Sequence, residues 1–407
     1  MMTQGRNLMS KLHVLIAGGG IGGLCLAQAL KKAGIDFSVF EREEAVAKSG
    51  YRLHMNMDGG EALKKCLPEN LYQLYIQTSR KNPRREMAVL IDERLNEVGV
   101  RPHIGAPNDK EFPHTAVNRR TLCQILLSGI EDDVYFNKKI VGFDQDEEGV
   151  RAYLEDGTIV RGDILVAADG INSVVRTQLL PGVTPMDTGA RAFYSKSPLT
   201  SEIRDKLPDI LFDGFTSVID DKGAYMAIGP YEARRPVVEA SKELAPFSYF
   251  EPVDDYIMIT LNVSASQLSL TDEELRQSDS TVYHEIMLNL TKDWHPILKG
   301  LVKRLDAESV SLLPVRSIKP IDPWPTSRVT LIGDAIHAMP PSFGAGCNLA
   351  LRDASILAEQ ILDIEKNKKD WKNAISQYEE EMRLHDYPIF EMSSNNDLAR
   401  KFNSVYK

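Results

Sequence analysis

The first segment whose residues suggest chemistry is a run of glycines near the start of the chain. Gly18, Gly20 and Gly23 satisfy the pattern GxGxxG, and Glu41 follows 18 residues after the last of them. In a dinucleotide site the first glycine allows a sharp turn, the second allows close approach of a pyrophosphate, and the third allows tight helix packing. The next helix offers free N–H groups to the phosphates. A carboxylate at position 41 would accept bonds from ribose hydroxyls, which favours FAD or NAD over NADP.

Two further segments place an aspartate beside a glycine directly after an apolar run. They are Asp169-Gly170 and Gly333-Asp334. After the second, Pro340 and Pro341 stiffen the backbone, and Gly344 and Gly346 permit it to approach a flat ring. A helix starting near residue 348 would direct its positive end at that ring and stabilise the negative charge of a reduced flavin.

The segment from Ser49 to Asn56 offers an arginine and a histidine for catalysis. If residues 53–57 form a strand, Arg52 and His54 lie on one face and share a pocket. Arg52 is a candidate for contacting the phosphates of FAD or of a nicotinamide nucleotide. His54 is a candidate for proton transfer, because an imidazole titrates near neutral pH. The alternative is a strand that packs on the core with its polar tips in solvent.

The elements that position these residues follow from the apolar pattern. Buried strands of a parallel sheet are expected at residues 13–17, 37–41, 164–168 and 329–332. Helices are expected at residues 22–33, 119–130, 272–290, 348–362 and 371–402, and Gly34 ends the first of them. Residues 135–161 predict a β meander with Asp156-Gly157 as a turn, and further strands are expected at residues 87–91, 223–228 and 256–263.

The nucleotide-binding segments lie at the start, the middle and near the end of the chain, so a second domain is inserted between them. We expect a discontinuous FAD-binding domain of residues 11–79, 114–183 and 311–365. Residues 80–113 and 184–310 would form the substrate-binding domain, and residues 366–407 a C-terminal helical segment. The substrate pocket would lie between the two domains, with Phe212, Tyr225, Met226 and Tyr256 as wall residues.

In this order and spacing, the three motifs resemble those of the group A flavoprotein monooxygenases, the para-hydroxybenzoate hydroxylase-like family. The resemblance implies an α/β fold in which a Rossmann-like FAD-binding domain (GR2/PHBH-type) carries an inserted mixed β-sheet substrate domain and a C-terminal helix. The sequence departs from the family at two positions. Ala345 stands where the family often has glutamine, and Ile336 replaces a small residue.

The resemblance also implies roles for single residues. Asp334 would bind the sugar-chain hydroxyls of FAD, and Asp169 would lie near the pyrophosphate and help to bind both nucleotides. Arg119 would contact the flavin nucleotide, with Arg120 as the competing candidate. Arg176 would hold the loop of Asp169 by pairing with an acid or a phosphate, or serve as a plain salt-bridge partner. The two prolines would line the isoalloxazine ring.

The candidate site contains catalytic and cofactor-binding residues, and no metal ligand is expected in it. The catalytic candidates are His54 and Arg52, and His337 is expected to satisfy a backbone group near the flavin loop instead. The residues expected to bind the cofactor are Gly18, Gly20, Ile21, Gly22, Gly23, Glu41, Arg42, Arg52, Arg119, Asp169, Gly170, Arg176, Gly333, Asp334, Pro341, Gly344, Gly346, Cys347 and Asn348.

The resemblance implies an FAD-dependent monooxygenase that uses NADPH or NADH and O2 to hydroxylate or epoxidise a small, aromatic substrate through a C4a-hydroperoxyflavin. No second GxGxxG is present, which suits a family whose NAD(P)H binds without its own Rossmann domain. The alternatives are a related FAD-dependent dehydrogenase or reductase that inserts no oxygen and a non-catalytic flavin-binding regulator. A halogenase is disfavoured because the segment WxWxIP is absent.

Composition narrows the setting of this chemistry. The 407 residues carry a net charge of −10, which argues against a nucleic-acid or anionic-membrane partner. The four cysteines are scattered without metal-ligand spacing, so neither a zinc site nor a disulfide frame is expected. No apolar run has the length of a membrane span, and residues 1–11 form a polar leader that we expect to be disordered. The expectation is a cytoplasmic monomer or homodimer without stable membrane association.

Overall fold

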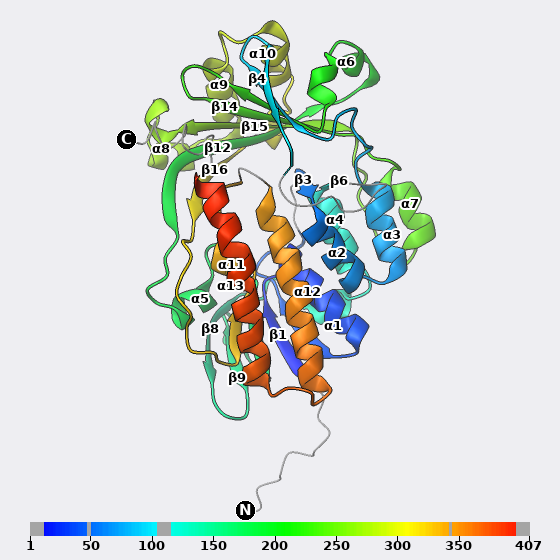
Figure 1. The fold of residues 1–407 in the computed structure, drawn as a ribbon, viewed down its shortest axis with the longest axis vertical. Coiled ribbons are helices and arrows are strands. Elements are labelled where there is room, and N and C mark those ends of the chain that lie inside the picture. The colour runs from blue at the N-terminus through cyan, green and yellow to red at the C-terminus, as the bar shows by residue number, and fades with distance from the viewer. Residues whose placement is uncertain (1–11, 47–49, 104–114, 342–343, 396–407) are drawn as a thin grey trace, which may run out of the picture.

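The computed structural model describes residues 12–46, 50–103, 115–341 and 344–395. Four parts of these expectations lie outside the described residues: the disordered leader, Ser49, the end of the segment 80–113 that was assigned to the substrate-binding domain, and the end of the tail helix. Figure 1 shows two layers of structure, with a parallel sheet and its helices below a larger sheet. None of the described helices combines the length and the apolar composition that a bilayer span requires.

A five-stranded parallel sheet has the order β17-β11-β1-β2-β7. Its strands are β1 (His13–Ala17), β2 (Asp36–Phe40), β7 (Val134–Tyr135), β11 (Ile164–Ala167) and β17 (Val329–Leu331). The four strands expected from apolar runs are therefore confirmed to within one residue. Their carboxyl ends meet at one edge of the sheet, and this brings together motifs that are far apart in the sequence.

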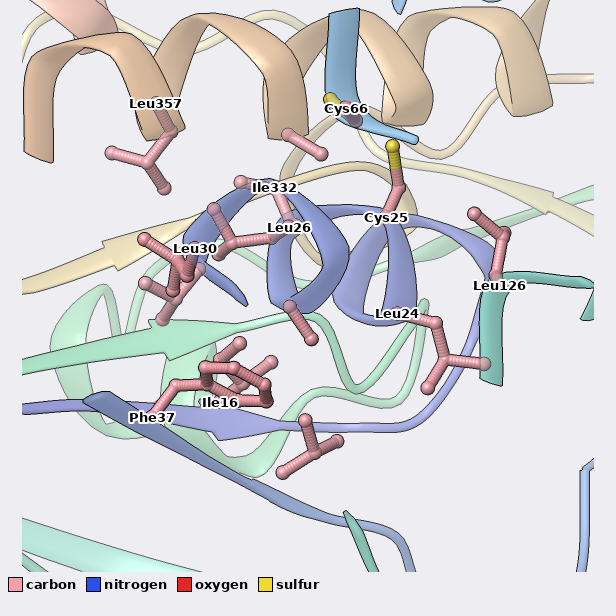
Figure 2. Close-up of a cluster of buried hydrophobic side chains, with 14 of the residues drawn as sticks. Ile16, Leu24, Cys25, Leu26, Leu30, Phe37, Cys66, Leu126, Ile332 and Leu357 are labelled. Carbon is pink, nitrogen blue, oxygen red and sulfur yellow. The ribbon is translucent and has the colours of Figure 1, made fainter. Parts of the chain in front are cut away.

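Helices pack against this sheet, and α1 (Ile21–Ala33) is the first of them. Figure 2 shows its apolar side chains Leu26 and Leu30 between Ile16 of β1 and Leu357 of α12 (Ala345–Glu365), while Leu24 lies beside Leu126. Gly34 ends α1 in the left-handed conformation with φ of 73°, as the sequence predicted. The C-terminal helix α13 (Trp371–Asn395) packs against α12.

Smaller elements connect these layers. The expected meander is confirmed as a sheet of β8 (Ile140–Gln145), β9 (Val150–Leu154) and β10 (Ile159–Gly162), and Gly157 makes the last turn with φ of 85°. Two short strands, β3 (Arg52–Met55) and β6 (Thr115–Asn118), pair antiparallel between the two large sheets. The helices here are α2 (Met57–Cys66), α3 (Glu69–Thr78), α4 (Arg119–Leu127), α5 (Val174–Leu179) and α11 (Asp334–His337).

The upper sheet has seven strands in the order β16-β12-β15-β14-β13-β4-β5. They are β4 (Ala88–Asp92), β5 (Glu97–Arg101), β12 (Met186–Pro198), β13 (Phe215–Ile219), β14 (Tyr225–Tyr231), β15 (Tyr256–Ser264) and β16 (Ser311–Ser317). Only the β13–β4 pair is parallel, so the sheet is mixed, as expected. Helices α9 (Ser280–Leu290) and α10 (Pro296–Lys303) share a core with its upper face. The remaining helices are α6 (Ser201–Asp205), α7 (Val237–Leu244) and α8 (Asp272–Gln277).

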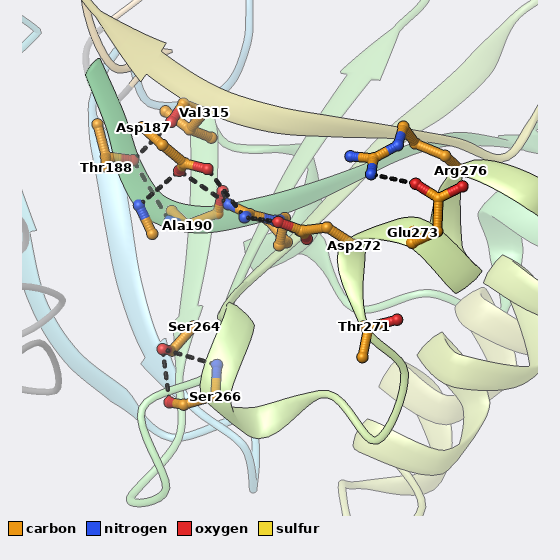
Figure 3. Close-up of polar contacts among 12 residues, drawn as sticks. Asp187, Thr188, Ala190, Ser264, Ser266, Thr271, Asp272, Glu273, Arg276 and Val315 are labelled. Carbon is orange, nitrogen blue, oxygen red and sulfur yellow. Dashed lines mark hydrogen bonds and ion pairs between the residues drawn. The ribbon is translucent and has the colours of Figure 1, made fainter.

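The long helix predicted at residues 272–290 is wrong, because the structure divides it into α8 and α9. Thr271 caps α8 in a capping box with Glu274, and the side chain of Asp279 accepts hydrogen bonds from the first amides of α9. A new N-cap residue in the middle of the segment therefore starts a second helix. Buried Arg191 of β12 pairs with Asp272 at 2.6 Å and with Asp187 at 2.9 Å, and so ties α8 to the sheet (Figure 3).

The expected domain limits also differ from the structure in two places. Strand β16 completes the edge of the seven-stranded sheet, although residues 311–317 were assigned to the FAD-binding part. Helix α7 packs against α3 and joins the core of the lower layer, although residues 237–244 were assigned to the substrate domain. Apolar patterning identifies such elements but not the layer on which their apolar face is buried.

Candidate active site at the interface of the two sheets

A cavity of about 950 Å³ lies between the parallel sheet and the seven-stranded sheet. Segments of all three glycine motifs form its lower side, and residues from all seven strands of the upper sheet form its roof. The expected site residues that line it are Gly20, Ile21, Gly22, Arg52, His54, Arg119, Gly170, Gly333, Asp334, Pro341, Gly344, Gly346 and Cys347. The fold therefore brings most of the predicted site into one space.

The three glycines of the first motif have separate structural reasons. Gly18 has φ of 107°, and a Cβ there would lie 2.4 Å from the carbonyl oxygen of Ala168. A Cβ at Gly23 would lie 2.1 Å from the carbonyl oxygen of Gly18. Gly20 is different, because no protein atom lies within 4 Å of its would-be Cβ, and it lines the cavity. Gly18 and Gly23 are thus required by the fold, whereas Gly20 keeps space free for a ligand.

The Asp169 segment supplies a buried carboxylate oxygen beside the cavity. Its Oδ2 atom accepts a hydrogen bond of 3.0 Å from the amide of Val174, while Oδ1 is buried and has no hydrogen-bond partner among the described residues. Burial raises the pKa of Asp169. Because a buried acceptor without a donor is costly, this oxygen fits a site that a ligand hydroxyl or amide completes.

Arg176 holds the Asp169 segment, but not through an acid or a phosphate as expected. Its side chain is 2% exposed and donates to the carbonyl oxygens of Ala335 at 3.0 Å, Ile171 at 2.9 Å and Val183 at 3.3 Å. The guanidinium therefore joins the loop after β11 to the loop after β17. It is not among the residues that line the cavity. The guanidinium presents its N–H donors in a fixed planar arrangement, and the three carbonyl oxygens accept hydrogen bonds from them.

Asp334 begins α11 and faces the cavity. Its side chain is exposed to that space, and desolvation by the many protein atoms around it raises the pKa of its carboxyl group. The charge of Arg119 acts in the opposite direction, and Arg119 lines the same cavity. Arg120, the competing candidate, instead pairs with Glu251. Arg119 is thus the arginine positioned near the nucleotide segments.

The last motif brings the N-terminus of α12 to the cavity. Gly344, Gly346 and Cys347 line it, and among the described residues Asp334 Oδ1, at 3.7 Å, would be the nearest contact of a Cβ at Gly346. The helix starts at Ala345, three residues earlier than expected. Both prolines line the cavity, and Ser393 of α13 donates a hydrogen bond of 3.1 Å to the Pro340 carbonyl.

Asn348 is a positioning residue of this motif and does not line the cavity. Its amide nitrogen donates to the carbonyl oxygens of His54 and Gly344, at 2.9 Å each, and its oxygen accepts from the amide of Asn56 at 3.0 Å. These bonds join β3 and α2 to the start of α12. The residue therefore fixes the distance between the His54 segment and the glycine loop.

Glu41 and Arg42 do not line the cavity either. Glu41 accepts hydrogen bonds from the amides of Gly19 at 2.7 Å and Glu43 at 2.9 Å, so it holds the glycine loop against the end of β2. Its expected bond to a ribose hydroxyl stays a prediction. Arg42 is exposed and pairs with Glu43 at 3.2 Å.

These residues fit FAD. The space kept free at Gly20, the buried Oδ1 of Asp169 and the cavity-facing carboxylate of Asp334 match a pyrophosphate and sugar hydroxyls. The volume of the cavity, about 950 Å³, lies near the upper end of the range for small-ligand sites, as a large cofactor requires. The helix end at Gly344 would stabilise negative charge on a ring placed before it.

Replacement of Asp334 by alanine tests this fit. We expect the dissociation constant for FAD to rise roughly 10- to 100-fold, because bonds from hydroxyl groups to a shielded carboxylate are lost. Titration of the FAD-free protein with FAD, followed by quenching of flavin fluorescence, measures the change. The exposed Asp132, in the short 3-10 turn between α4 and β7, provides the control D132A. Equal dissociation constants for D334A and the unsubstituted protein would show that Asp334 does not bind FAD.

The roof of the cavity follows the alternation of the upper sheet. In β15, Ile257, Ile259 and Leu261 face the helices, and Met258, Thr260 and Asn262 face the cavity. Of the expected wall residues, Tyr225 is confirmed. The prediction is wrong for the other three residues. Met226 lies on the opposite face of β14, in the core with the helices. Phe212 lies under the guanidinium of Arg204, and Tyr256 is buried against the ring of Tyr231. The sequence did not indicate Tyr194 and Phe215, because β12 and β13 were not predicted. Met258 lies in a strand that was predicted, but its neighbour Tyr256 was chosen as the wall residue instead.

Arg52 and His54 both line the cavity, as the predicted strand required. The Nη2 atom of Arg52 donates to the carbonyl oxygen of Gly214 at 3.0 Å, and its guanidinium lies 5.6 Å from the ring of Phe215. Arg52 thus reaches the upper sheet. The ring of His54 stacks on His103 at 4.5 Å, and a Cβ at Gly344 would lie 3.2 Å from the Cβ of His54. His54 therefore lies beside the glycine loop of α12.

His337 does not satisfy a backbone group as expected. Its Nε2 atom lies 2.7 Å from Asp353 of α12 and 3.2 Å from Asp386 of α13, and all three side chains are buried. Burial by itself lowers the pKa of His337, but the two carboxylates outweigh it and raise this pKa to about 9. The imidazole is therefore protonated at neutral pH. Because Asp353 also accepts from the amide of Gly333 at 2.8 Å, the cluster fixes the loop that carries Asp334.

Comparison with known proteins gives two family matches within the chain. Residues 16–60 match the model of an NAD(P)-binding Rossmann-like domain, and residues 274–389 match the model of an FAD binding domain. The chain is 34% identical over 388 residues to the dual O-methyltransferase/FAD-dependent monooxygenase CTB3 of Cercospora beticola. That alignment covers 91% of this chain but only 44% of the relative, so the chain spans less than half the length of that protein.

Solved structures extend the likeness over the whole fold. A candidate FAD containing monooxygenase from Photorhabdus luminescens is 30% identical, with a TM-score of 0.80 over 97% of this chain and 99% of that chain. A salicylate hydroxylase complex has a TM-score of 0.70 at 20% identity, over 97% of this chain and 93% of that chain, and supports the fold. The cavity geometry, the family models and the full-length match agree, and the chain belongs to the FAD-dependent monooxygenases of the group A, para-hydroxybenzoate hydroxylase-like family.

Proposed function

We propose that the protein uses NADPH or NADH and O2 to hydroxylate or epoxidise a small aromatic molecule. One observation carries this proposal. A single cavity has the dinucleotide segments on its lower side and a roof of aromatic and apolar side chains from the inserted sheet. A flat substrate held under Tyr194, Phe215 and Met258 would therefore lie over the segment that carries Pro340, Pro341 and Gly344. Relatives such as the FAD-dependent urate hydroxylase of Klebsiella oxytoca, which is 25% identical over 374 residues, support the same class of reaction.

The overall reaction would consume NAD(P)H, a proton and O2. It would give NAD(P)+, water and a product with one added oxygen atom. Bound FAD would supply the acceptance of hydride and the activation of O2, which no side chain can perform. The chain would supply position, charge and the exclusion of water.

Single residues can be assigned to these tasks. Gly20 and Gly170 would leave room for the pyrophosphate, and Asp334 would hold the sugar chain. The N-terminus of α12 would stabilise negative charge on the reduced ring. His54, beside Gly344, would give a proton to the reacting oxygen or take one from the substrate. The closed roof would keep water from the reacting atoms.

Mass spectrometry with labelled O2 tests the proposal. FAD-loaded protein would be incubated with NADPH or NADH and a library of phenols, quinolones and polyketides. We expect one library member to speed oxidation of the nicotinamide nucleotide and to gain one labelled oxygen atom. Anaerobic turnover with an artificial electron acceptor, and no label in any product, would favour the second candidate, a dehydrogenase or reductase of the same fold. Absence of any turnover would favour a flavin-binding regulator.

A further inference from the structure

We propose that the substrate carries an anionic oxygen on its ring system, as a carboxylate, a phenolate or an enolate, and that Arg52 is the residue that anchors it. This inference rests on the proposed function, because it concerns the substrate of the same cavity. It goes further by naming the charge of the substrate and the group that recognises it. The geometry around Arg52 carries the argument.

Arg52 is a buried cation that faces the cavity, and no carboxylate of the described residues lies within ion-pair distance of it. Its side chain is 4% exposed and lines the cavity, and its Nη2 atom donates a hydrogen bond to the carbonyl oxygen of Gly214. Its Nε atom is buried and has no hydrogen-bond partner, and it forms no ion pair with any residue of the described chain. Burial, followed by the neighbouring charge of Arg80, lowers the pKa of Arg52 to about 9. An anion in the cavity would remove the cost of such a buried charge.

The neighbouring Arg80 is a buried arginine whose charge is compensated by an acid. It is equally buried and contacts the same carbonyl oxygen of Gly214 at 3.5 Å, but it pairs with Glu86 at 3.6 Å. Glu86 also lies 3.4 Å from His103, so this carboxylate already serves two groups. Arg80 does not line the cavity. Of the two adjacent guanidinium groups, the one without an acid is the one that faces the ligand space.

The upper sheet makes room for Arg52 at one position. Ala88, Phe215, Gly229 and Met258 are consecutive cross-strand partners of β4, β13, β14 and β15. Gly229 is the gap in this row, and a Cβ there would lie 3.0 Å from Cδ of Arg52. The aliphatic part of the Arg52 side chain packs on the sheet at this glycine, and its guanidinium lies beside the ring of Phe215. The charge is therefore placed at the roof, where a ring under Phe215 and Met258 would direct an acidic substituent.

The same strand would hold two ends of one substrate. Arg52 reaches the roof of the cavity, and His54, two residues later, lies beside Gly344 at the start of α12. A substrate anchored at Arg52 would present its other part to the region of His54. The phosphates of the nucleotides would have their own places at Gly20 and Gly170, which lie in the segments that follow β1 and β11 of the lower sheet. Arg52 is therefore assigned to the substrate and not to a nucleotide phosphate.

Calorimetric titration of the oxidised, FAD-loaded protein without NAD(P)H tests the inference. One pair of probes is 3-hydroxy-2-naphthoate and its neutral amide, 3-hydroxy-2-naphthamide. The other is 4-nitrophenol at a pH where it is ionised and its neutral methyl ether, 4-nitroanisole. We expect the anion of at least one pair to bind on the order of 10- to 100-fold more tightly than its neutral partner, as for a charge-assisted hydrogen bond. The pair that discriminates tells a carboxylate substrate from a phenolate or enolate substrate.

Substitution of Arg52 identifies the anchor. R52M is expected to abolish the preference for the anion while leaving the affinity for the neutral partner within about twofold. R52K, which retains the charge without the planar fork, is expected to keep part of the preference and serves if R52M fails to hold FAD. The control R120M removes a guanidinium that pairs with Glu251 and does not line the cavity. It is expected to keep the full preference.

Three results would overturn the inference. They are equal affinities for anion and neutral partner in the unsubstituted protein, an equal loss of both affinities in R52M, and an unchanged preference in R52M and R52K. Because binding is measured without NAD(P)H or O2, the two proposals fail separately. Selective binding without oxygen transfer would refute the proposed function alone, and oxygen transfer without selective binding would refute the role of Arg52 alone.

Discussion

Replacing Gly20 by valine is expected to give a folded protein that is colourless. No protein atom lies within 4 Å of the Cβ position, and the backbone there has an extended conformation that any residue adopts. The valine side chain would therefore meet no neighbour and would project into the cavity. It would occupy the space that a pyrophosphate needs in order to reach the N–H groups of α1. Because at least two charge-assisted hydrogen bonds would be lost, the dissociation constant for FAD should rise more than about 100-fold.

Two matched glycine variants make this result specific. Gly182 lies in an exposed turn and has no protein atom within 4 Å of its Cβ position, so G182V should bind FAD normally. G18V places its Cβ 2.4 Å from a carbonyl oxygen at a positive φ, and it should lower the yield of folded protein. The ratio of flavin to protein absorbance after reconstitution, and the melting temperature of each FAD-free variant, separate these outcomes. A yellow G20V protein would contradict the assigned role of Gly20.

Loss of the buried imidazole of His337 is expected to destabilise the protein strongly. In H337L, the carboxylates of Asp353 and Asp386 would remain buried between α12 and α13 without their cation. Removing one partner of a buried charge cluster costs about 3–5 kcal/mol of the free energy of unfolding. Urea unfolding at neutral pH measures this loss. His284 provides the control, because its ring bonds a backbone carbonyl at 2.7 Å and no acid, so H284L should cost about 1 kcal/mol.

The same cluster predicts how stability depends on pH. The pKa of His337 is about 9 in the folded protein and about 6.5 in an unfolded chain, so the folded state binds more protons between these values. Its contribution is fully present below pH 6.5, and about 3 kcal/mol should be lost as the pH rises to 9. Burial and the charge of Asp353 raise the pKa of Asp386 from 3.8 to about 7. The folded state therefore also binds more protons than the unfolded chain between these two values, and stability should decline as the pH rises through this lower range.

Arg352 and His385 also face the carboxylate of Asp386, at 3.9 and 2.9 Å, so the measured change belongs to the whole cluster. H337L should flatten the decline of stability between pH 6.5 and 9. H284L should retain it. An equally steep decline in H337L would show that another group is responsible.

The lower half of the fold was predictable because its signals are local. An apolar run followed by glycines sets each parallel strand and its turn, and four of these strands agree with the structure to within a residue. Gly18, Gly20 and Asp334 could be assigned for the same reason. Arg176 and Asn348 could not, because their partners belong to segments far away in the sequence. Only the folded chain shows that both residues bind backbone groups and hold the site together.

The upper half was harder to predict because alternation alone does not identify the side that faces the ligand. Tyr225 and Met226 are neighbours in β14, and only packing against α9 and α10 decides that Met226 belongs to the core. Phe215 and Tyr194 lie in β13 and β12, two strands that the sequence pattern did not predict. A short polar segment, Ser278-Asp279, was enough to divide the predicted helix at residues 272–290. Strand β16 joins the upper sheet although it directly precedes the last nucleotide motif.

The gap at Gly229 has a consequence for how this protein can change. Any side chain at residue 229 would press on the stem of Arg52, while a short residue at position 52 would leave a hole above the glycine. Residues 52 and 229 should therefore change together in evolution, and glycine should be retained at position 229 wherever arginine is retained at position 52. Libraries designed to alter what the enzyme accepts should vary both codons jointly, since changing either alone meets a steric penalty or a void.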